Sequence, residues 1–305
     1  MRVSRAPIWC LGGAVWDRKL RLLAPLAAGS SNPVAESSAP GGVARNVAHN
    51  LRLLGLPVQL LSAWGDDAGG AQLQADCERL GIGVGAVLRC PGQASGSYSA
   101  VLQPDGNLLL GLAQLDALEA LTPVALRRTT ARRRTAPVQL ADMNLRADTL
   151  TAWLTEPRQG LAVLLAVSEP KMQRLPANLA GLDLLIANAG EWQAAGGGAR
   201  LARRGLRRVL VTEGARGLRC GHWQDGRWRW QRLPAPLVAE LLDATGAGDA
   251  LAAGVLAAWR SGVAADDLPR AARFGQQLAA RALGSLHSVA PDIGPDLLKE
   301  FLDAP

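Results

Sequence analysis

The segment from Leu241 to Gly254, Leu-Leu-Asp-Ala-Thr-Gly-Ala-Gly-Asp-Ala-Leu-Ala-Ala-Gly, constrains the fold more than any other part of this chain. Gly246 and Gly248 allow a tight turn where an apolar, strand-like run changes into an Ala- and Leu-rich helix that ends near Arg260. The unpaired N–H groups at such a helix start carry the positive end of the helix dipole and suit an anion. Asp249 is therefore either a helix cap or a base beside a bound phosphate.

The rest of the chain alternates apolar strand patterns with helical ones, which predicts a mostly parallel sheet covered by helices. A hairpin signal, Pro104-Asp105-Gly106 between two apolar runs, falls outside this alternation. We expect one α/β domain over 1–305, with a small β lid contributed by about 15–39 and 97–112. The expected strands are 8–15, 58–64, 138–141, 162–167, 182–187 and 208–212, the expected helices are 43–54 and 71–80, and 131–137 is expected to be a surface connection.

Composition limits the possible partners. The net charge of +7 comes from scattered arginines, since the chain has only three lysines, and one Tyr and two Phe offer little for base stacking. We therefore expect solvated basic faces and no nucleic-acid partner. No apolar run reaches the roughly 18 residues that a membrane span needs.

The cysteines and the N-terminal residues bear on location. Four widely spaced cysteines form no disulfide pattern, which favours a reducing cytoplasm. Met1 to Trp16 resembles a short signal peptide, but Asp17-Arg18-Lys19 interrupts it and no convincing cleavage site follows. A first core strand that ends at Gly12-Gly13 accounts for this segment better.

Four ordered segments carry a resemblance to a known family. Gly41-Gly-Val-Ala-Arg-Asn46, continuing to Gly55, and Asp243-Ala-Thr245-Gly-Ala-Gly-Asp249 resemble the two signatures of the PfkB (ribokinase-like) sugar kinases. Asn188-Ala-Gly-Glu191 and Thr212-Glu-Gly214-Ala-Arg-Gly217 resemble segments that lie between those signatures. The resemblance covers nearly the whole chain and implies a ribokinase-like three-layer sandwich with a mostly parallel central sheet and a small β lid.

One subfamily is more similar still. Ser31-Asn32-Pro33, the Gly-Gly-Val-Ala-Arg-Asn run, Ala141-Asp-Met-Asn-Leu145 and Val167-Ser-Glu-Pro-Lys171 resemble pseudouridine kinases, which use ATP to phosphorylate the 5′-hydroxyl of a nucleoside ribose. Gln114-Leu115, Ala187 and Ala244 depart from the usual pattern and bear on the identity of the substrate. A kinase for ribose or adenosine and a non-catalytic ligand sensor on the same fold remain alternatives.

The catalytic hypothesis rests on the second signature. Phosphoryl transfer needs an oriented hydroxyl, charge neutralisation and a proton acceptor. We expect Asp249 to accept the hydroxyl proton, while Gly246 forms the turn and the amides of Ala247, Gly248 and Asp249 stabilise the transferring phosphoryl group. An N-cap role for Asp249 is the alternative, although a cap does not require the preceding Thr-Gly-Ala-Gly.

Polar residues at strand and helix ends are candidate substrate ligands. Asp17 and Asn46 are of the types that make paired hydrogen bonds with a ribose diol, and the resemblance assigns both to the sugar, with Gly42 allowing close backbone approach. A turn Asp and a capping Asn are the alternative readings of these two residues. Asn32, Asn144 and Lys171 are weaker candidates for contacts to the base or the ribose.

The resemblance also implies a nucleotide site with ATP and Mg²⁺, and a monovalent cation such as K⁺ is a further candidate. Glu191 is expected to reach Mg²⁺ and phosphate through water and Asn188 to contact phosphate or nucleotide, with helix capping as the alternative for both. The remaining expected ligands are Thr212, Gly214 and Gly217 for the nucleotide and Asp243 and Thr245 for the monovalent cation. The expected partner is a small nucleoside or sugar, and a homodimer contact through the lid is a further candidate.

Overall fold

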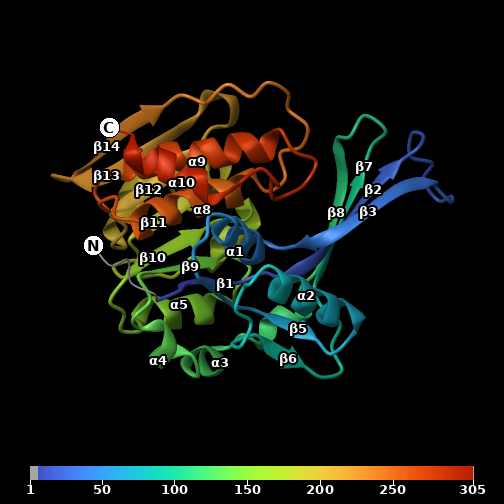
Figure 1. Cartoon of the computed structure of the whole chain (residues 1–305), viewed down its shortest axis with the longest axis horizontal. Helices are drawn as coiled ribbons and strands as arrows, with labels where there is room; N and C mark the ends of the chain where they lie inside the picture. The colour runs from blue at the N-terminus through green and yellow to red at the C-terminus, as the bar shows by residue number, and fades with distance from the viewer. Residues whose placement is uncertain (1–5, 305) are drawn as a thin grey trace.

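An eight-stranded sheet forms the centre of the computed structural model, which describes residues 6–304 (Figure 1). Its strand order is β14-β13-β12-β11-β10-β9-β1-β4, and its strands run parallel except β13 and β14, which are antiparallel to their neighbours. The strands of this sheet are β1 (Ile8–Leu11), β4 (Val58–Leu61), β9 (Val138–Asp142), β10 (Leu161–Leu165), β11 (Leu184–Asn188), β12 (Arg208–Thr212), β13 (Leu218–Gln224) and β14 (Arg227–Leu233).

Helices cover both faces of this sheet, as the near-continuous apolar strands require. One face is covered by α1 (Val43–Leu53), α2 (Ala68–Arg79), α8 (Ala247–Arg260), α9 (Leu268–Leu283) and α10 (Pro295–Asp303). The other side carries α3 (Pro123–Arg127), α4 (Thr130–Arg133), α5 (Ala147–Thr155), α6 (Ala189–Ala194) and α7 (Gly198–Arg203). This three-layer arrangement confirms the predicted fold class.

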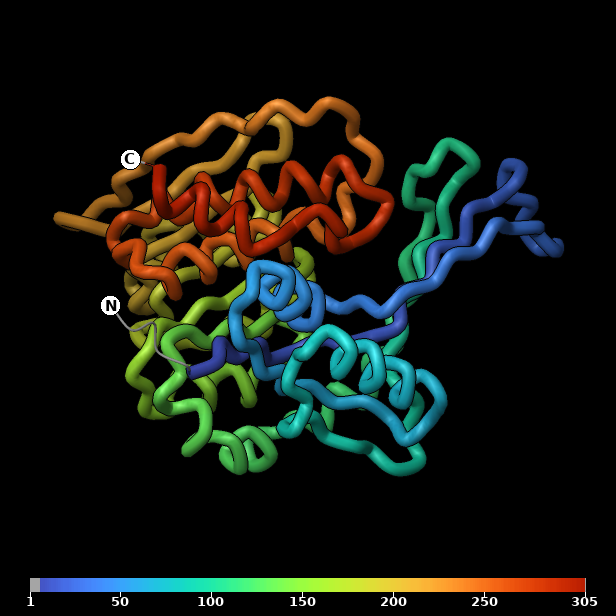
Figure 2. The backbone as a smooth tube through the Cα atoms, in the orientation of Figure 1, coloured from blue at the N-terminus to red at the C-terminus, as the bar shows by residue number. Residues whose placement is uncertain are grey.

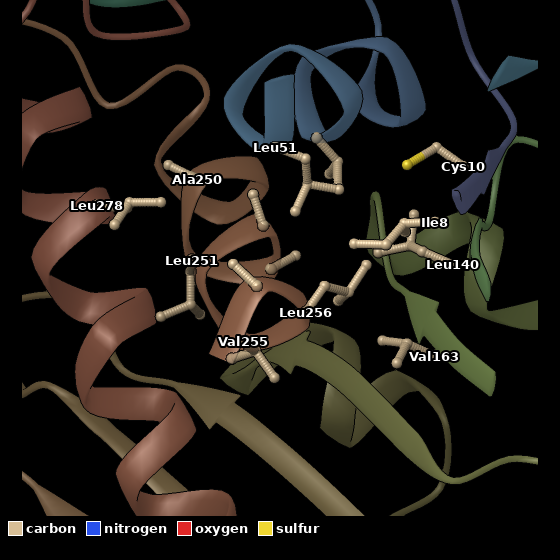
Figure 3. Packing of buried hydrophobic residues seen from close by; sticks show 14 of the residues in the cluster. Ile8, Cys10, Leu51, Leu140, Val163, Ala250, Leu251, Val255, Leu256 and Leu278 are labelled. Carbon is tan, nitrogen blue, oxygen red and sulfur yellow. The ribbon is translucent and has the colours of Figure 1, made fainter. Parts of the chain in front are cut away.

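Side-chain alternation along the strands separates the two cores. In β1, Ile8 and Cys10 face the core under α1 and α8, whereas Trp9 and Leu11 face the opposite core. Leu51 of α1 and Leu256 of α8 lie in the first of these cores together with Ile8 (Figure 3). The shared core fixes the starts of α1 and α8 relative to one another.

Helix α8 is buried along almost its whole length, which explains its small side chains. A Cβ atom on Gly254 would lie 2.6 Å from the Cα of Gly275 in α9, so the two helix backbones nearly touch. The close contact gives α8 a fixed position between α1 and α9.

A second sheet projects from the body as the lid (Figure 2). Its strand order is β3-β2-β7-β8, with β2 parallel to β7 and the other pairs antiparallel. The lid strands are β2 (Val15–Leu22), β3 (Val34–Gly41), β7 (Ser97–Leu102) and β8 (Leu108–Gln114), and a separate two-stranded pair is β5 (Ala63–Gly65) with β6 (Leu88–Cys90). Because β1 leads directly into β2, the lid is connected to β1, which lies between β9 and the edge strand β4 of the central sheet.

Some expected elements differ from the structure. The expected strand 8–15 is interrupted at Gly12-Gly13, so β1 stays in the body and β2 enters the lid. The expected strand 58–64 divides into β4 and β5 in the same way. The segment 131–137, expected to be a surface connection, instead begins inside α4. It is also not wholly on the surface, since Arg133 is buried and donates to Gln139 Oε1 on β9 at 2.9 Å.

The strand-like interpretation of Leu241 and Leu242 was wrong. Both side chains are exposed in an irregular segment after β14, and Pro234 and Pro236 lack the N–H groups that a continuing strand would need. The Leu242 N–H instead donates to the carbonyl of Leu283 at the end of α9. The turn before α8 is therefore approached from a loop.

The cysteine and membrane expectations can be compared with the fold. All four cysteines are free and buried. Within residues 6–304, no helix has the length and apolar character needed to cross a bilayer. The opening residues of the signal-like segment, 1–5, lie outside the described residues, and its apolar part forms β1.

Candidate active site

The start of α8 has the geometry of an anion site. Gly246 is the N-cap residue with φ of 84°, and a Cβ atom there would overlap the backbone of Ser288, so only glycine fits. Asp249 is the third residue of the helix, and no side chain caps this end. The structure therefore excludes the N-cap interpretation of Asp249.

Space for a ligand lies in front of this turn. A Cβ atom on Gly248 would meet nothing within 4 Å, so the backbone here is open to close approach. The first N–H groups of a helix have no partner inside the helix, which leaves them available to an anion. The Ala247 N–H lies 3.4 Å from the Ala244 carbonyl, a long contact that a bound phosphate oxygen could replace.

Asp249 meets Asn46 across the two signature segments. Asn46 Nδ2 donates to Asp249 Oδ2 at 3.0 Å, although the residues are 203 positions apart. Burial raises the pKa of Asp249 to about 7, the Asn46 hydrogen bond opposes this rise, and the nearby charges of Asp142 and Asp17 add to it. A carboxyl group with a pKa near neutrality can both take and release a proton under ordinary conditions.

The sugar-side residues lie at the base of the lid. A side chain on Gly41, at the end of β3, would overlap the carboxylate of Asp17, so Asp17 lies directly over the glycine turn. Burial raises the pKa of Asp17 to about 6, while Lys19 and Arg45 lower it. Gly42 has φ of 94°, and a Cβ atom there would lie 2.6 Å from the Gly13 carbonyl oxygen. The close passage brings the start of α1, and with it Asn46, beside the end of β1.

Asp142 is a buried carboxylate at the centre of the site that sequence reasoning did not select. At the end of β9, it accepts hydrogen bonds from the backbone N–H groups of Gly13 at 2.8 Å, Ala44 at 3.0 Å and Asn144 at 2.8 Å. Burial raises its pKa, and these hydrogen bonds oppose the rise. Its place after an apolar strand and two residues before Asn144 was the available signal.

Asn144 and Lys171 lie together beside Asp142. The Lys171 ammonium donates to Asn144 Oδ1, and Arg174 holds the Asn144 carbonyl at 2.6 Å. Burial lowers the pKa of Lys171, while the charge of Asp142 raises it. The structure thus brings these two predicted ligands into one polar group with Asp142.

Asn32 does not lie in the polar group formed by Asp142, Asn144 and Lys171 of the same chain. It lies in the loop between β2 and β3 at the outer end of the lid (Figure 2). Its side chain bonds the N–H and carbonyl of Ala27 and the carbonyl of Ser30, closing the loop on itself. The contact to a nucleoside predicted for Asn32 stays a prediction.

On the expected nucleotide side, Asn188 and Glu191 form a capping box. Asn188 Oδ1 accepts from the Glu191 N–H at 2.9 Å, and Glu191 Oε2 accepts from the Asn188 N–H at 2.8 Å. The helix-capping alternative therefore describes both side chains. Burial raises the pKa of Glu191, with Glu169 adding to the rise.

The role of Mg²⁺ in this region stays a prediction. Within the described part of the chain, no group of three or more His, Cys, Asp or Glu side chains could hold a metal. Mg²⁺ commonly binds through substrate phosphates, waters and one or two carboxylates. The metal role of Glu191 stays a prediction, in which its second carboxylate oxygen would face the ion through water.

The glycines after β12 fit a nucleotide backbone contact. Thr212 ends β12, and a Cβ atom on Gly214 would meet nothing within 4 Å. Gly217 is packed against Leu233 and Pro234 and has φ of 89°, so it shapes the turn. Both glycines lie in the turn between β12 and β13, and the contact of Thr212, Gly214 and Gly217 with ATP stays a prediction.

The candidate monovalent-cation site already contains a positive charge. One oxygen of Asp243 accepts from the Thr245 N–H at 2.8 Å, and the other bonds the ammonium of Lys19 from lid strand β2. Burial opposes the change, but the hydrogen bonds from Lys19 and Thr245 hold the pKa of Asp243 below its usual value. Sequence reasoning missed this contact, which links the lid to the loop before α8.

The three-layer fold and the carboxylate beside a helix start together define a ribokinase-like kinase of the sugar and nucleoside class. The chain belongs to the pfkB family carbohydrate kinases, whose family model matches residues 10–292. The resemblance drawn from the signature segments is thereby confirmed at the level of the family.

Individual relatives agree with this assignment. The chain is 30% identical over 278 residues to a pseudouridine kinase of Escherichia coli, covering 86% of each chain. It resembles the solved structure of a carbohydrate kinase from Agrobacterium tumefaciens with a TM-score of 0.79 and 31% identity, covering 97% of this chain and 96% of the other. Ribokinase of Arabidopsis thaliana, solved with ribose and ATP, shares the fold with a TM-score of 0.80 at 17% identity, covering 98% of this chain and 99% of the other.

The three hydrogen bonds to Asp142 give a stability prediction. Asp142→Ala leaves the N–H groups of Gly13, Ala44 and Asn144 buried without their acceptor. We expect the free energy of unfolding, measured by urea denaturation, to fall by about 3 kcal/mol.

Asp292→Ala is the matched control. The Asp292 side chain is 63% exposed, and its ion pair with Arg281 is long, with 3.6 Å between Nε and Oδ2. Its effect should stay within about 0.5 kcal/mol. Equal effects of the two substitutions would contradict the role given to Asp142.

Proposed function

We propose that this kinase transfers the γ-phosphoryl group of ATP to the 5′-hydroxyl of pseudouridine. The observation that carries the proposal is the Asn46–Asp249 hydrogen bond, which joins the expected sugar-binding segment to the expected phosphate-binding turn. A proton acceptor, a hydroxyl-binding amide and an anion site then share one location. These are the groups that phosphoryl transfer to an alcohol requires.

Asp249 acts as the base in this proposal. Its carboxylate accepts the proton of the 5′-hydroxyl as the hydroxyl oxygen forms a bond to the γ-phosphorus and the bond from that phosphorus to the ADP oxygen breaks. Its pKa of about 7 leaves a large ionised fraction at neutral pH, and the proton then passes to solvent. The buried position keeps water from competing for the phosphoryl group.

The start of α8 stabilises the charge that moves with the phosphoryl group. The N–H groups of Ala247, Gly248 and Asp249 lie in the first turn, where the helix dipole favours negative charge. Bound ATP with Mg²⁺ supplies the phosphoryl group and additional positive charge. Asn188, Thr212, Gly214 and Gly217 would hold the nucleotide, and Glu191 would reach the metal through water.

Asp17 and Asn46 bind the ribose in this proposal. With a pKa of about 6, Asp17 is mostly ionised at pH 7 and can accept hydrogen bonds from a diol. The Asn46 amide group has two N–H bonds and gives one of them to Asp249. The other N–H is available to the sugar, so Asn46 can bind the ribose and the Asp249 carboxylate at the same time. Such a pair orients the 5′-hydroxyl toward the carboxylate.

Asn144 and Lys171 are the proposed contacts for the nucleobase of the substrate. Amide and ammonium N–H groups match the carbonyl oxygens of a uracil ring, which pseudouridine presents. The Escherichia coli relative at 30% identity is a pseudouridine kinase, and this supports the choice over ribose or adenosine. The Asn144 backbone N–H donates to Asp142, and the charge of Asp142 opposes the lowering of the Lys171 pKa by burial, so both residues lie near the carboxyl end of β9.

We also propose that the lid forms the contact of a homodimer. Four leucines of β8 are between 40% and 58% exposed, on both faces of an edge strand. A second copy of the chain would bury these side chains. The leucines are Leu108, Leu109, Leu110 and Leu112.

A cytoplasmic location is consistent with this function. ATP is available there, and the four cysteines are free and buried. Asp243 pairs with Lys19, so a monovalent cation would have to bind beside this ion pair or displace it. A K⁺ requirement therefore stays a proposal to be tested by replacing K⁺ with a large organic cation.

A substrate panel tests the proposed function. Purified protein with ATP and Mg²⁺ should form ADP fastest with pseudouridine, compared with uridine, adenosine and ribose. A preference for adenosine or ribose would replace the proposed substrate, and no turnover on the whole panel would favour a ligand-sensing role.

The role of Asp249 predicts a pH dependence. Because the carboxylate is the active form, kcat/KM should rise as pH increases through about 7 and fall below it. Asp249→Asn should lower kcat by roughly 100-fold or more and remove this rise, with an unchanged thermal unfolding midpoint. A variant with near-normal kcat would contradict the assignment.

A further inference from the structure

The side chain of Asn46 is held at both of its ends. Its Oδ1 accepts a hydrogen bond from Arg45 Nη1 at 3.2 Å, while its Nδ2 donates to Asp249 at 3.0 Å. A guanidinium group can only donate, so it binds the carbonyl end of the amide. Arg45 thereby determines that the NH₂ end of Asn46 faces Asp249.

Arg45 is in turn held by a carboxylate on the next helix. Arg45 Nη2 lies 2.5 Å from Asp76 Oδ2 of α2, and Nη1 also donates to the Pro40 carbonyl at 3.1 Å. The Arg45 side chain is 5% exposed and that of Asp76 is 14% exposed. A charge-assisted contact that is shielded from water is strong and directional.

We propose that Asp76 and Arg45 form a positioning chain that acts through Asn46 to orient the carboxylate of Asp249. The proposal rests on the proposed function of Asp249 as the base. Without the Arg45 contact, the amide of Asn46 can rotate and present its oxygen to the Asp249 carboxylate, which repels it. The reacting hydroxyl would then meet a displaced acceptor.

The charges around this chain favour the same orientation. Asp249 faces the carboxylates of Asp142 and Asp17, so it depends on Asn46 for its one favourable side-chain contact among the described residues. On the α1 side of this chain of contacts, the charges of Arg45, Asp76 and Arg79 all act on the pKa of His49. Burial and Arg45 lower the pKa of His49 to about 4, so it carries no charge at neutral pH.

Arg79 offers a matched control. It pairs with the other oxygen of Asp76 at 2.7 Å, but its side chain is 68% exposed and it makes no contact with Asn46 in the described structure. Its removal changes the charge beside Asp76 and leaves the path from Asp76 to Asp249 intact.

A double-mutant cycle tests the proposal, with pseudouridine and ATP as substrates. We expect Arg45→Met to lower kcat by about tenfold or more in the native background, and by less than about twofold in Asn46→Ala, where no amide remains to be oriented. Asp76→Asn should lower kcat in the same direction as Arg45→Met. Arg79→Met should leave kcat within about twofold.

The pH profile supplies a second readout that a merely structural role would not move. Asp76→Asn should shift the rise of kcat/KM to higher pH, because the hydrogen bond from Asn46 that favours the ionised Asp249 carboxylate is weakened. Arg45→Met should shift it in the same direction, but there the loss of the charge that lowers the pKa of Asp17 contributes as well. If Arg45→Met fails to fold, Asp76→Asn in native and Asn46→Ala backgrounds gives the same cycle.

Two results distinguish the ways in which the account can fail. Equal loss of kcat in both backgrounds, or an unchanged kcat in Arg45→Met and Asp76→Asn, would overturn the positioning chain while Asp249→Asn remains inactive. Near-normal turnover by Asp249→Asn would overturn the proposed function on which the chain rests.

Discussion

The hydrogen bond between Asn46 and Asp249 is the contact on which the arrangement of the site depends. It joins the first turns of α1 and α8, which are far apart in sequence and are packed on the same face of the central sheet. The shared apolar core sets the distance between the two helix starts, and Gly42 and Gly246 allow the close backbone approach at each one. The 3.0 Å hydrogen bond between Asn46 and Asp249 therefore depends on how α1 and α8 pack in their shared core.

Buried carboxylates give the site its chemical character. Asp17, Asp142 and Asp249 come from three different segments, and burial raises the pKa of each. Two of the three lysines in the chain act on these acids, because Lys19 opposes the rise in the pKa of Asp17 and Lys171 opposes that of Asp142. Burial of these carboxylates disfavours their charged forms and so destabilises the free protein. It also raises the pKa of Asp249 to about 7, which makes a proton acceptor available near neutral pH.

Local patterns were enough to predict the layers and the projecting β-sheet. The apolar periodicity identified the sheet strands, and the two signature segments drew attention to Asn46 and Asp249, which the structure places in contact. The contacts that depend on tertiary structure could not be predicted. Asp142 binds N–H groups from two other segments, and the pairs Lys19–Asp243 and Arg45–Asp76 join residues 224 and 31 positions apart.

Other differences arose where one local signal had two physical meanings. Asn188 and Glu191 fit both a nucleotide site and a capping box, and the structure contains the capping box. Leu241 and Leu242 looked like a strand because they are apolar, but nearby prolines prevent pairing with the sheet. Asn32 lies before the glycine pair in sequence, yet the hairpin carries it to the outer end of the lid (Figure 2).

The most direct test of the central claim is a crystal structure with pseudouridine and a non-hydrolysable ATP analogue. The account predicts the 5′-oxygen within about 2.6–3.2 Å of an Asp249 carboxylate oxygen, and the γ-phosphate at the first turn of α8. A 5′-oxygen directed away from Asp249, in a complex with both ligands ordered, would contradict it.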